Sequence, residues 1–232
     1  MTDQRAGGST LLCDFIVKHQ LEEIAPKEVV DFGPGAGKYG RMIREVLPKG
    51  CVAVAVEGYK KTAEMLSENG WYDEIHHSLL QAWIAEDSRH FDVAIFGDVL
   101  EHLTSGEIHQ VMKKCIQKFD HIIIVAPLHE IFQDTLYENS LEIHKTYMTS
   151  RFFDRYDPIE KHIVRGKDDE GNDWTIMNVH IVVGSKRDPF YRRTSKFVFH
   201  LCMMVLQPVG LARPFVDFLT LNLARYKWLL RG

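Results

Sequence analysis

Short apolar runs alternate with segments of helical spacing between about residues 28 and 126 of the chain. Such alternation is typical of a parallel sheet built from βαβ units, in which helices connect neighbouring strands. The run Val52–Glu57 carries only Val and Ala before its last residue, as expected of a strand buried on both faces. The expected strands are Glu28–Phe32, Val52–Glu57, a weaker strand near Ile75, Phe91–Phe96 and His121–Ala126, and the expected helices are Arg41–Leu47, Thr62–Asn69 and Glu107–Phe119. We therefore predict an α/β fold with helices on both faces of the sheet.

The pattern changes after Pro127. A polar, aromatic stretch with several histidines extends to about Arg155, and two strand-like runs follow it, His162–Arg165 and Trp174–Gly184. The residues between these runs are rich in Asp, Asn and Gly, which favour turns. We predict an antiparallel hairpin here, which completes a mostly parallel, seven-stranded sheet.

A glycine-rich loop, residues 33–40 (GPGAGKYG), lies between the first expected strand and the first expected helix. In open α/β sheets this position receives nucleotide-like ligands. Glu57 ends the next strand, 20 residues after Gly37, where its carboxylate can accept hydrogen bonds from both hydroxyls of a ribose. Residues 35–40 also fit the G-x-G-x-x-G pattern of dinucleotide-binding enzymes. The loop alone therefore leaves an NAD-linked oxidoreductase or a sugar-nucleotide enzyme open.

Two further features separate these cofactor classes. Asp31 lies two residues before the first glycine, and residues 98–102 after the fourth expected strand read DVLEH. With these residues the chain resembles class I S-adenosylmethionine-dependent methyltransferases over about residues 26–127. The first motif of that family is an acid followed by G-x-G-x-G, which Asp31 to Gly37 match without a gap, and Glu57 matches its ribose-binding acid. The resemblance implies a Rossmann-like, doubly wound fold, S-adenosyl-L-methionine as the cofactor and methyl transfer as the activity.

The chemistry of this cofactor agrees with the residues that the resemblance implies. S-adenosylmethionine carries a sulfonium, an ammonium and a carboxylate, so its methionine end requires carboxylates beside backbone N–H groups. An aromatic ring after the ribose-binding acid can pack on the adenine. The expected cofactor-binding residues are Asp31, Gly33, Gly35, Gly37, Glu57, Gly58, Tyr59 and Asp98. One departure from the family is the sequence His76-His77-Ser78, where many relatives place an acid near the adenine amine, so backbone groups would have to serve there.

Two histidines are the candidates for contact with the acceptor. Methyl transfer depends chiefly on alignment, and a base is needed only where the acceptor must lose a proton. His102 follows the fourth expected strand at the cofactor edge of the sheet, and we expect it to act as a base or a substrate contact, with loop ordering as the alternative. The resemblance makes His144, in the stretch after the fifth expected strand, the second catalytic candidate.

Other polar residues carry less weight. Surface solvation is the preferred interpretation for four residues near His144, namely His129, Glu130, Lys145 and Tyr147. His76 and His77 are neighbours on an expected strand and point to opposite faces, and no carboxylate or cysteine lies at a ligand spacing from them. We therefore expect no metal site.

Composition and charge narrow the function classes. The chain has 232 residues, of which 45% are hydrophobic and 26% charged, as in ordinary globular proteins. Its four cysteines include no C-x-x-C pair, which favours a reducing compartment over a disulfide framework or a zinc site. Neither a secretory signal pattern nor an apolar run of 18 residues occurs, so we expect a cytoplasmic protein.

The last part of the chain differs from the rest. From Lys186 onward there are nine Lys or Arg and two Asp or Glu, a local charge of +7; since the whole chain carries −4, the remaining residues carry −11. We predict a methyltransferase domain over residues 1–187 and a basic, apolar helical extension over residues 188–232. The extension is expected to pack on the domain or on a second copy, with peripheral binding at the inner membrane face as the alternative. The acidic body disfavours nucleic acid as a partner.

The preferred function is methyl transfer to a hydroxyl of a small-molecule or glycan acceptor. The Gly-Lys-Tyr-Gly continuation of the glycine loop and the aromatic stretch around His144 resemble a bacterial branch of the family that is associated with glycan pathways. Besides the NAD-linked enzyme, a non-catalytic adaptor that keeps the cofactor fold stays open as an alternative.

Overall fold

The computed structural model describes residues 11–47, 49–128, 139–167 and 173–184. All of them lie in the first of two compact units into which the chain divides, Met1–Arg187 and Asp188–Gly232. The predictions for the helical extension, and those for His129 and Glu130, fall outside the described residues. No helix within the described residues is long and apolar enough to cross a membrane.

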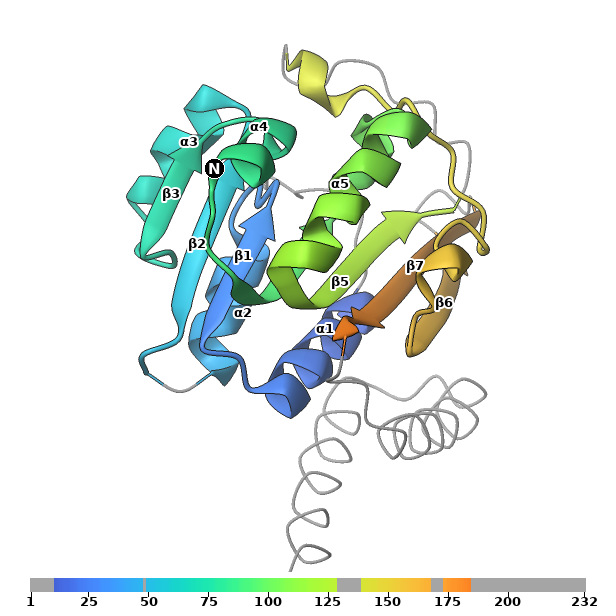
Figure 1. Ribbon diagram of the computed structural model, residues 1–232, viewed down its shortest axis with the longest axis horizontal. Helices are drawn as coiled ribbons and strands as arrows, with labels where there is room; N and C mark the ends of the chain where they lie inside the picture. Colours follow the sequence, from blue (N-terminus) through green and yellow to red (C-terminus); the bar gives the residue numbers. More distant parts are fainter. Residues whose placement is uncertain (1–10, 48, 129–138, 168–172, 185–232) are drawn as a thin grey trace, which may run out of the picture. The chain divides into compact units, whose positions relative to one another are not determined.

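A seven-stranded sheet forms the centre of the described domain (Figure 1), with the strand order β3-β2-β1-β4-β5-β7-β6. The first five strands in the chain run parallel, whereas β7 pairs antiparallel with both β5 and β6. The predicted mostly parallel sheet with a late antiparallel hairpin is thus confirmed. The strands are β1 (Glu28–Phe32), β2 (Val52–Glu57), β3 (Glu74–His77), β4 (Phe91–Gly97), β5 (Phe119–Pro127), β6 (Glu160–Lys167) and β7 (Asp173–Val182).

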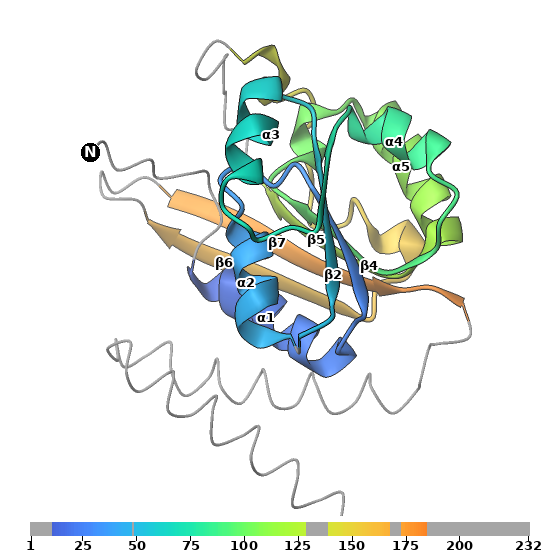
Figure 2. The same cartoon turned by 90° about the vertical axis from the view of Figure 1, so that its left-hand side faces the viewer.

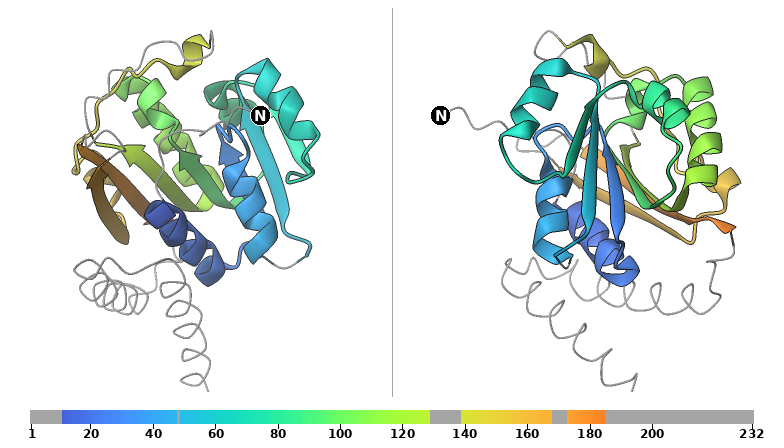
Figure 3. Two further views of the ribbon diagram at one scale, coloured as in Figure 1. Left: turned by 180° about the vertical axis from the view of Figure 1, so that it is seen from behind. Right: turned by 60° about the vertical axis from the view of Figure 1, so that its left-hand side comes forward.

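Helices cover both faces of the sheet, as Figure 2 shows with the sheet seen nearly edge-on. Helices α4 and α5 lie on one face and α1, α2 and α3 on the other, an arrangement that both views of Figure 3 repeat. The helices are α1 (Leu11–Ile24), α2 (Lys38–Val46), α3 (Lys60–Ser67), α4 (Leu80–Glu86) and α5 (Ser105–Lys118), and three 3-10 turns are η1 (Leu100–His102), η2 (Ser140–Glu142) and η3 (Asp154–Tyr156).

The core on the α4 and α5 face is built around aromatic rings from neighbouring strands. The ring of Phe32 stacks on that of Phe96 with centroids 4.7 Å apart, and it meets the edges of Trp83 and Phe119 at 5.6 and 6.0 Å. Offset and edge-to-face pairs of this kind add to the stabilisation that burial provides. The core thereby fixes the last residue of β1, from which the glycine-rich loop departs.

Helices α1 and α4 were not expected from the sequence. In α1 the buried positions Cys13, Ile16, Val17, Gln20 and Leu21 follow helical spacing, so a signal was present, but Gln20 breaks its apolar character. Gln20 is buried because its amide donates to Glu160 at 3.1 Å and to Asn178 at 2.9 Å across the sheet. Helix α5 begins at Ser105, two residues before the predicted start at Glu107, and Thr104 and Glu107 form a reciprocal capping box at this end.

Candidate functional site

The glycine-rich loop leaves β1 at the carboxyl edge of the sheet. Gly33, Gly35 and Gly37 have φ angles of 63°, 52° and 81°, in the left-handed region. Gly33 is also confined by packing, because a Cβ atom there would lie 2.6 Å from Cγ2 of Val99, which follows β4. The loop backbone is therefore held against the end of β4 in a conformation that side chains disfavour.

Asp31, at the fourth position of β1, is fully buried beneath this loop. Its Oδ2 accepts a hydrogen bond from the Tyr72 hydroxyl at 2.5 Å, and that hydroxyl accepts one from the backbone N–H of Gly40 at 3.0 Å. Gly40 leaves the room that this requires, since a Cβ atom there would lie 2.3 Å from Cζ of Tyr72. Oδ1 of Asp31 is buried and has no hydrogen-bond partner within the described residues. A buried oxygen in this state favours either a proton or a cationic ligand.

Burial raises the pKa of Asp31 to about 7, although the hydrogen bond from Tyr72 and the charge of Lys38 oppose the rise and Glu57 adds to it. The pKa of an aspartate in the unfolded chain is near 4. At pH values between about 4 and about 7, Asp31 therefore holds a proton in the folded chain that it has released in the unfolded chain. The stability of the ligand-free protein should therefore fall as the pH rises from about 4 to about 7, by up to about 4 kcal/mol.

Asp31→Asn should flatten this decline, because an amide carries no charge at any of these pH values. Urea unfolding at half-unit steps of pH measures the effect, and Asp154→Asn, at an exposed aspartate on η3, is the matched control. Equal slopes for Asp31→Asn and the wild type would show that Asp31 does not titrate in this range.

Glu57 ends β2 beside the glycine loop and is 8% exposed. Its Oε1 accepts a hydrogen bond from the backbone N–H of Tyr59 at 2.8 Å. Burial raises the pKa of Glu57, while hydrogen bonds from the backbone of Tyr59, Gly35 and Gly58 work against the rise. The carboxylate thus connects the end of β2 to the apex of the loop, and the two halves of the predicted binding pattern lie together.

The remaining expected binding residues lie along the same edge. Asp98 follows β4 with a φ of 52°, a strained value for a residue other than glycine, and its backbone N–H donates to Val125 at 2.9 Å. Tyr59 is partly buried at the start of α3. A Cβ atom on Gly58 would lie 2.9 Å from Cδ1 of Leu141, so η2 packs against the end of β2. Figures 1 to 3 show η2 beyond the carboxyl ends of the parallel strands.

A second group of polar side chains lies where η1 follows β4. The imidazoles of His102 and His144, predicted from positions 42 residues apart, approach edge to face with centroids 5.0 Å apart. Nε2 of His102 lies 3.9 Å from Oε2 of Glu142. Burial lowers the pKa of His102, which keeps its ring neutral at pH 7, and burial raises the pKa of Glu142. The negative charge of Glu142 also acts on Glu57, so the two groups of side chains share one edge and one electrostatic environment.

No family model and no curated protein sequence matches this chain. Solved structures do match: TehB from Haemophilus influenzae has a TM-score of 0.58 at 14% identity, over 73% of this chain and 62% of that chain. The plantazolicin methyltransferase BpumL, in complex with S-adenosylhomocysteine (SAH), has a TM-score of 0.53 at 10% identity, over 75% and 84%. The N-terminal domain of EvdMO1, crystallised with SAH and D-fucose, has a TM-score of 0.54 at 11% identity, over 76% and 85%.

The strand order and these structural neighbours indicate the same fold. The chain has a class I methyltransferase fold. It spans less than two thirds of the TehB chain. In the dinucleotide-binding fold with the order 3-2-1-4-5-6 the sheet ends on a further parallel strand, whereas here antiparallel β7 lies between β5 and β6. The methyltransferase fold therefore weighs against the NAD-linked alternative that the glycine pattern left open.

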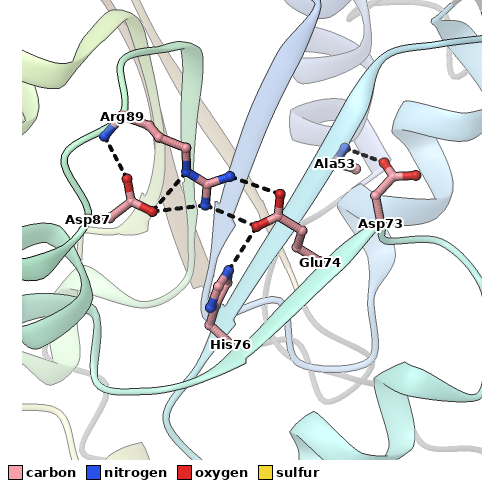
Figure 4. Close-up of polar contacts among 6 residues, drawn as sticks. All are labelled: Ala53, Asp73, Glu74, His76, Asp87 and Arg89. Carbon is pink, nitrogen blue, oxygen red and sulfur yellow. Dashed lines mark hydrogen bonds and ion pairs between the residues drawn. The ribbon is translucent and has the colours of Figure 1, made fainter.

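The polar residues Glu74 and His76 of β3 form a cluster with the segment before β4. Figure 4 shows Glu74 at the start of β3 in a two-pronged ion pair with Arg89, at 2.8 and 2.9 Å, and Arg89 also binding Asp87. Nε2 of His76 lies 3.1 Å from Oε2 of Glu74, within hydrogen-bond distance, so a carboxylate does accompany that histidine. Because Arg89 occupies both oxygens of Glu74, this cluster is a structural tie between β3 and the segment before β4, at the amino edge.

Three residues of the candidate site were missed in the sequence. Tyr72 lies in an irregular segment before β3, where no periodicity marks it as a partner of Asp31. Glu101 is 2% exposed, and in the sequence it was named only as part of the segment DVLEH. Glu142 lies 40 residues after His102 in the sequence, and only the path of the chain after β5 brings its carboxylate near the His102 ring. Of the weaker candidates, Lys145 and Tyr147 are exposed, as their preferred interpretation required.

Proposed function

We propose that this chain is an S-adenosylmethionine-dependent methyltransferase that acts on a hydroxyl of a small-molecule or glycan acceptor. The observation that carries the proposal is the pairing of two carboxyl groups across the glycine loop. Glu57 is fixed by backbone N–H groups at the end of β2, and Asp31 offers a buried oxygen without a described partner under the same loop. Both belong to the edge where open α/β sheets bind their ligands.

These residues fit the proposed cofactor. Glu57 would accept hydrogen bonds from the ribose hydroxyls, and Tyr59 and Gly58 lie beside it for the adenine. The backbone of Gly33 to Gly37 would lie against the methionine part, whose ammonium and sulfonium charges suit the negative potential that Asp31, Glu57 and Asp98 create. Bound S-adenosylmethionine supplies an activated methyl group on sulfur.

The acceptor side is assigned to the group around His102. Its neutral imidazole can accept a proton from a hydroxyl, and Glu142 lies close enough to stabilise the imidazolium that results. His144, with its ring against His102, would orient the acceptor. The N-terminal domain of EvdMO1, crystallised in the presence of SAH and D-fucose, supports the glycan class. The adaptor alternative requires none of these contacts.

Incubation of the purified chain with trideuteromethyl-labelled S-adenosylmethionine and a small-molecule extract tests the proposal by mass spectrometry. We expect labelled products in the wild-type reaction and none with Asp98→Ala. Products confined to hydroxyl-bearing compounds would support the acceptor class. SAH binding without any labelled product from extracts of the source cells would favour the adaptor.

A further inference from the structure

Three side chains with metal-binding atoms converge at the end of β4. They are Glu101 and His102, which are consecutive in η1, and His144, which arrives from the segment after η2. One carboxylate oxygen and one ring nitrogen from each histidine all lie within 4.8 Å of one another. Ligands of a bound divalent ion lie about 2.0–2.3 Å from it, and thus about 3–4.5 Å from each other. The three atoms need only a small inward movement to share an ion.

The backbone holds this arrangement together. The carbonyl oxygen of Glu101 accepts hydrogen bonds from the N–H groups of Lys145 at 2.8 Å and Thr146 at 3.1 Å. The hydroxyl of Thr146 donates to the carbonyl of Leu103 at 2.6 Å. His144 is therefore positioned beside Glu101 by the chain itself rather than by the side chains of the cluster. A site assembled in this way loses little conformational entropy when an ion binds.

The orientation of His102 also suits a ligand. Its Nδ1 lies 3.4 Å from the carbonyl oxygen of Ile143, and a hydrogen bond between these two atoms requires the tautomer with a proton on Nδ1. Nε2 then keeps its lone pair and lies on the side of Glu142. Metal-binding histidines commonly donate their second ring N–H to a backbone carbonyl in this manner.

Glu101 supplies an independent reason for a cation. Its side chain is 2% exposed, and Oε2 is buried without a hydrogen-bond partner in the described part of the chain. The charged groups that act on it are Asp98 and Glu142, both carboxylates. A buried carboxyl group with one oxygen left without a hydrogen bond, among other carboxylates, is unfavourable unless a proton or a positive ion offsets it.

We propose that Glu101, His102 and His144 bind a divalent first-row transition-metal ion. Two imidazoles and one carboxylate suit Mn²⁺, Fe²⁺, Co²⁺ or Zn²⁺, whereas Mg²⁺ and Ca²⁺ prefer oxygen ligands throughout. The proposal departs from the expectation of no metal site, which rested on His76 and His77 and on the spacing of the cysteines. Three protein ligands leave coordination positions open.

The role of the ion rests on the proposed function. Open positions beside the methyl donor would bind oxygen atoms of the acceptor, which narrows the acceptor class to compounds with a hydroxyl or two neighbouring hydroxyls. An ion there would lower the pKa of a bound hydroxyl. His102 would then act on the acceptor through the ion rather than as the base itself. The role as a metal ligand requires the ion for methyl transfer, whereas the role as a base does not.

Binding of Co²⁺ alone to the untagged, chelator-treated full chain tests the site, with visible absorption for its coordination and calorimetry for its affinity. We expect one strong site in the wild type and at least tenfold weaker binding in His144→Ala and Glu101→Gln. His90→Ala, an exposed histidine before β4, should bind like the wild type. Thermal unfolding without metal verifies that each variant is folded.

Two outcomes would overturn the metal site: Co²⁺ binding weaker than millimolar, or strong binding that both His144→Ala and Glu101→Gln leave unchanged. SAH binding to the same metal-free chain is measured in parallel. Loss of Co²⁺ binding with intact SAH binding would refute the ion alone, whereas Co²⁺ binding without SAH binding would refute the proposed function and leave the ion site standing.

Discussion

The variant Glu57→Ala should bind SAH about 100-fold more weakly than the wild type. The Glu57 carboxylate is held at the end of β2 by the N–H of Tyr59, where it would accept two hydrogen bonds from the ribose. Hydrogen bonds to a charged group contribute about 1.5 kcal/mol or more each, and a loss of about 3 kcal/mol corresponds to about 100-fold in affinity. Isothermal titration calorimetry measures the change.

The matched control for this variant is Glu64→Ala on α3, whose side chain is exposed and pairs with Lys60. It should bind SAH as the wild type does, since exposed i,i+4 pairs contribute little. Glu57→Gln should fall between the two, because the amide keeps one acceptor oxygen and loses the charge. If Glu57→Ala and Glu64→Ala bind SAH equally well, Glu57 does not contact the ribose.

The variant Gly40→Ala should lose about 3 kcal/mol of stability. A Cβ atom on Gly40 would lie 2.3 Å from Cζ and 2.6 Å from the hydroxyl of Tyr72. Tyr72 would have to move, and its hydrogen bond to the buried Oδ2 of Asp31 would break. Overpacking costs about 1–3 kcal/mol, and a lost hydrogen bond to a buried acid adds to it. The midpoint of urea unfolding at pH 7 reports the loss.

Gly106→Ala provides the comparison for Gly40→Ala. Both glycines lie near the start of a helix, but a Cβ atom on Gly106 would meet no atom within 4 Å. Alanine should stabilise α5 there by up to about 1 kcal/mol, because it is the better helix former. Equal stability of Gly40→Ala and Gly106→Ala would mean that Tyr72 does not need the space above Gly40.

The positions of the strands along the chain could be predicted from the sequence because most strands carry their own local signal. Val52–Glu57 and Glu28–Phe32 were predicted to the residue, and the hairpin was found from the turn-forming residues inside it. Helix α4 was missed since its seven residues are too few to show a periodicity. Gln20 hid α1, because its burial depends on partners in β6 and β7 that are more than a hundred residues away.

The residues of the candidate site likewise fall into a predictable group and a group that the sequence does not reveal. Asp31, the loop glycines and Glu57 lie at fixed sequence distances from the ends of their strands. The topology therefore brings them together, and their spacing in the sequence predicts that they share one site. Tyr72, Glu101 and Glu142 reach the site from irregular segments whose path is set by tertiary contacts. Glu101 is the clearest case, because only the fold shows that its side chain points inward without a described hydrogen-bond partner for Oε2.

Calorimetric titration of the full chain with SAH and, separately, with NAD tests the central claim most directly. We predict one SAH site of micromolar or tighter affinity and no heat from NAD at the same concentrations. Tight binding of NAD with no binding of SAH would contradict the account, because the loop and Glu57 would then serve a dinucleotide.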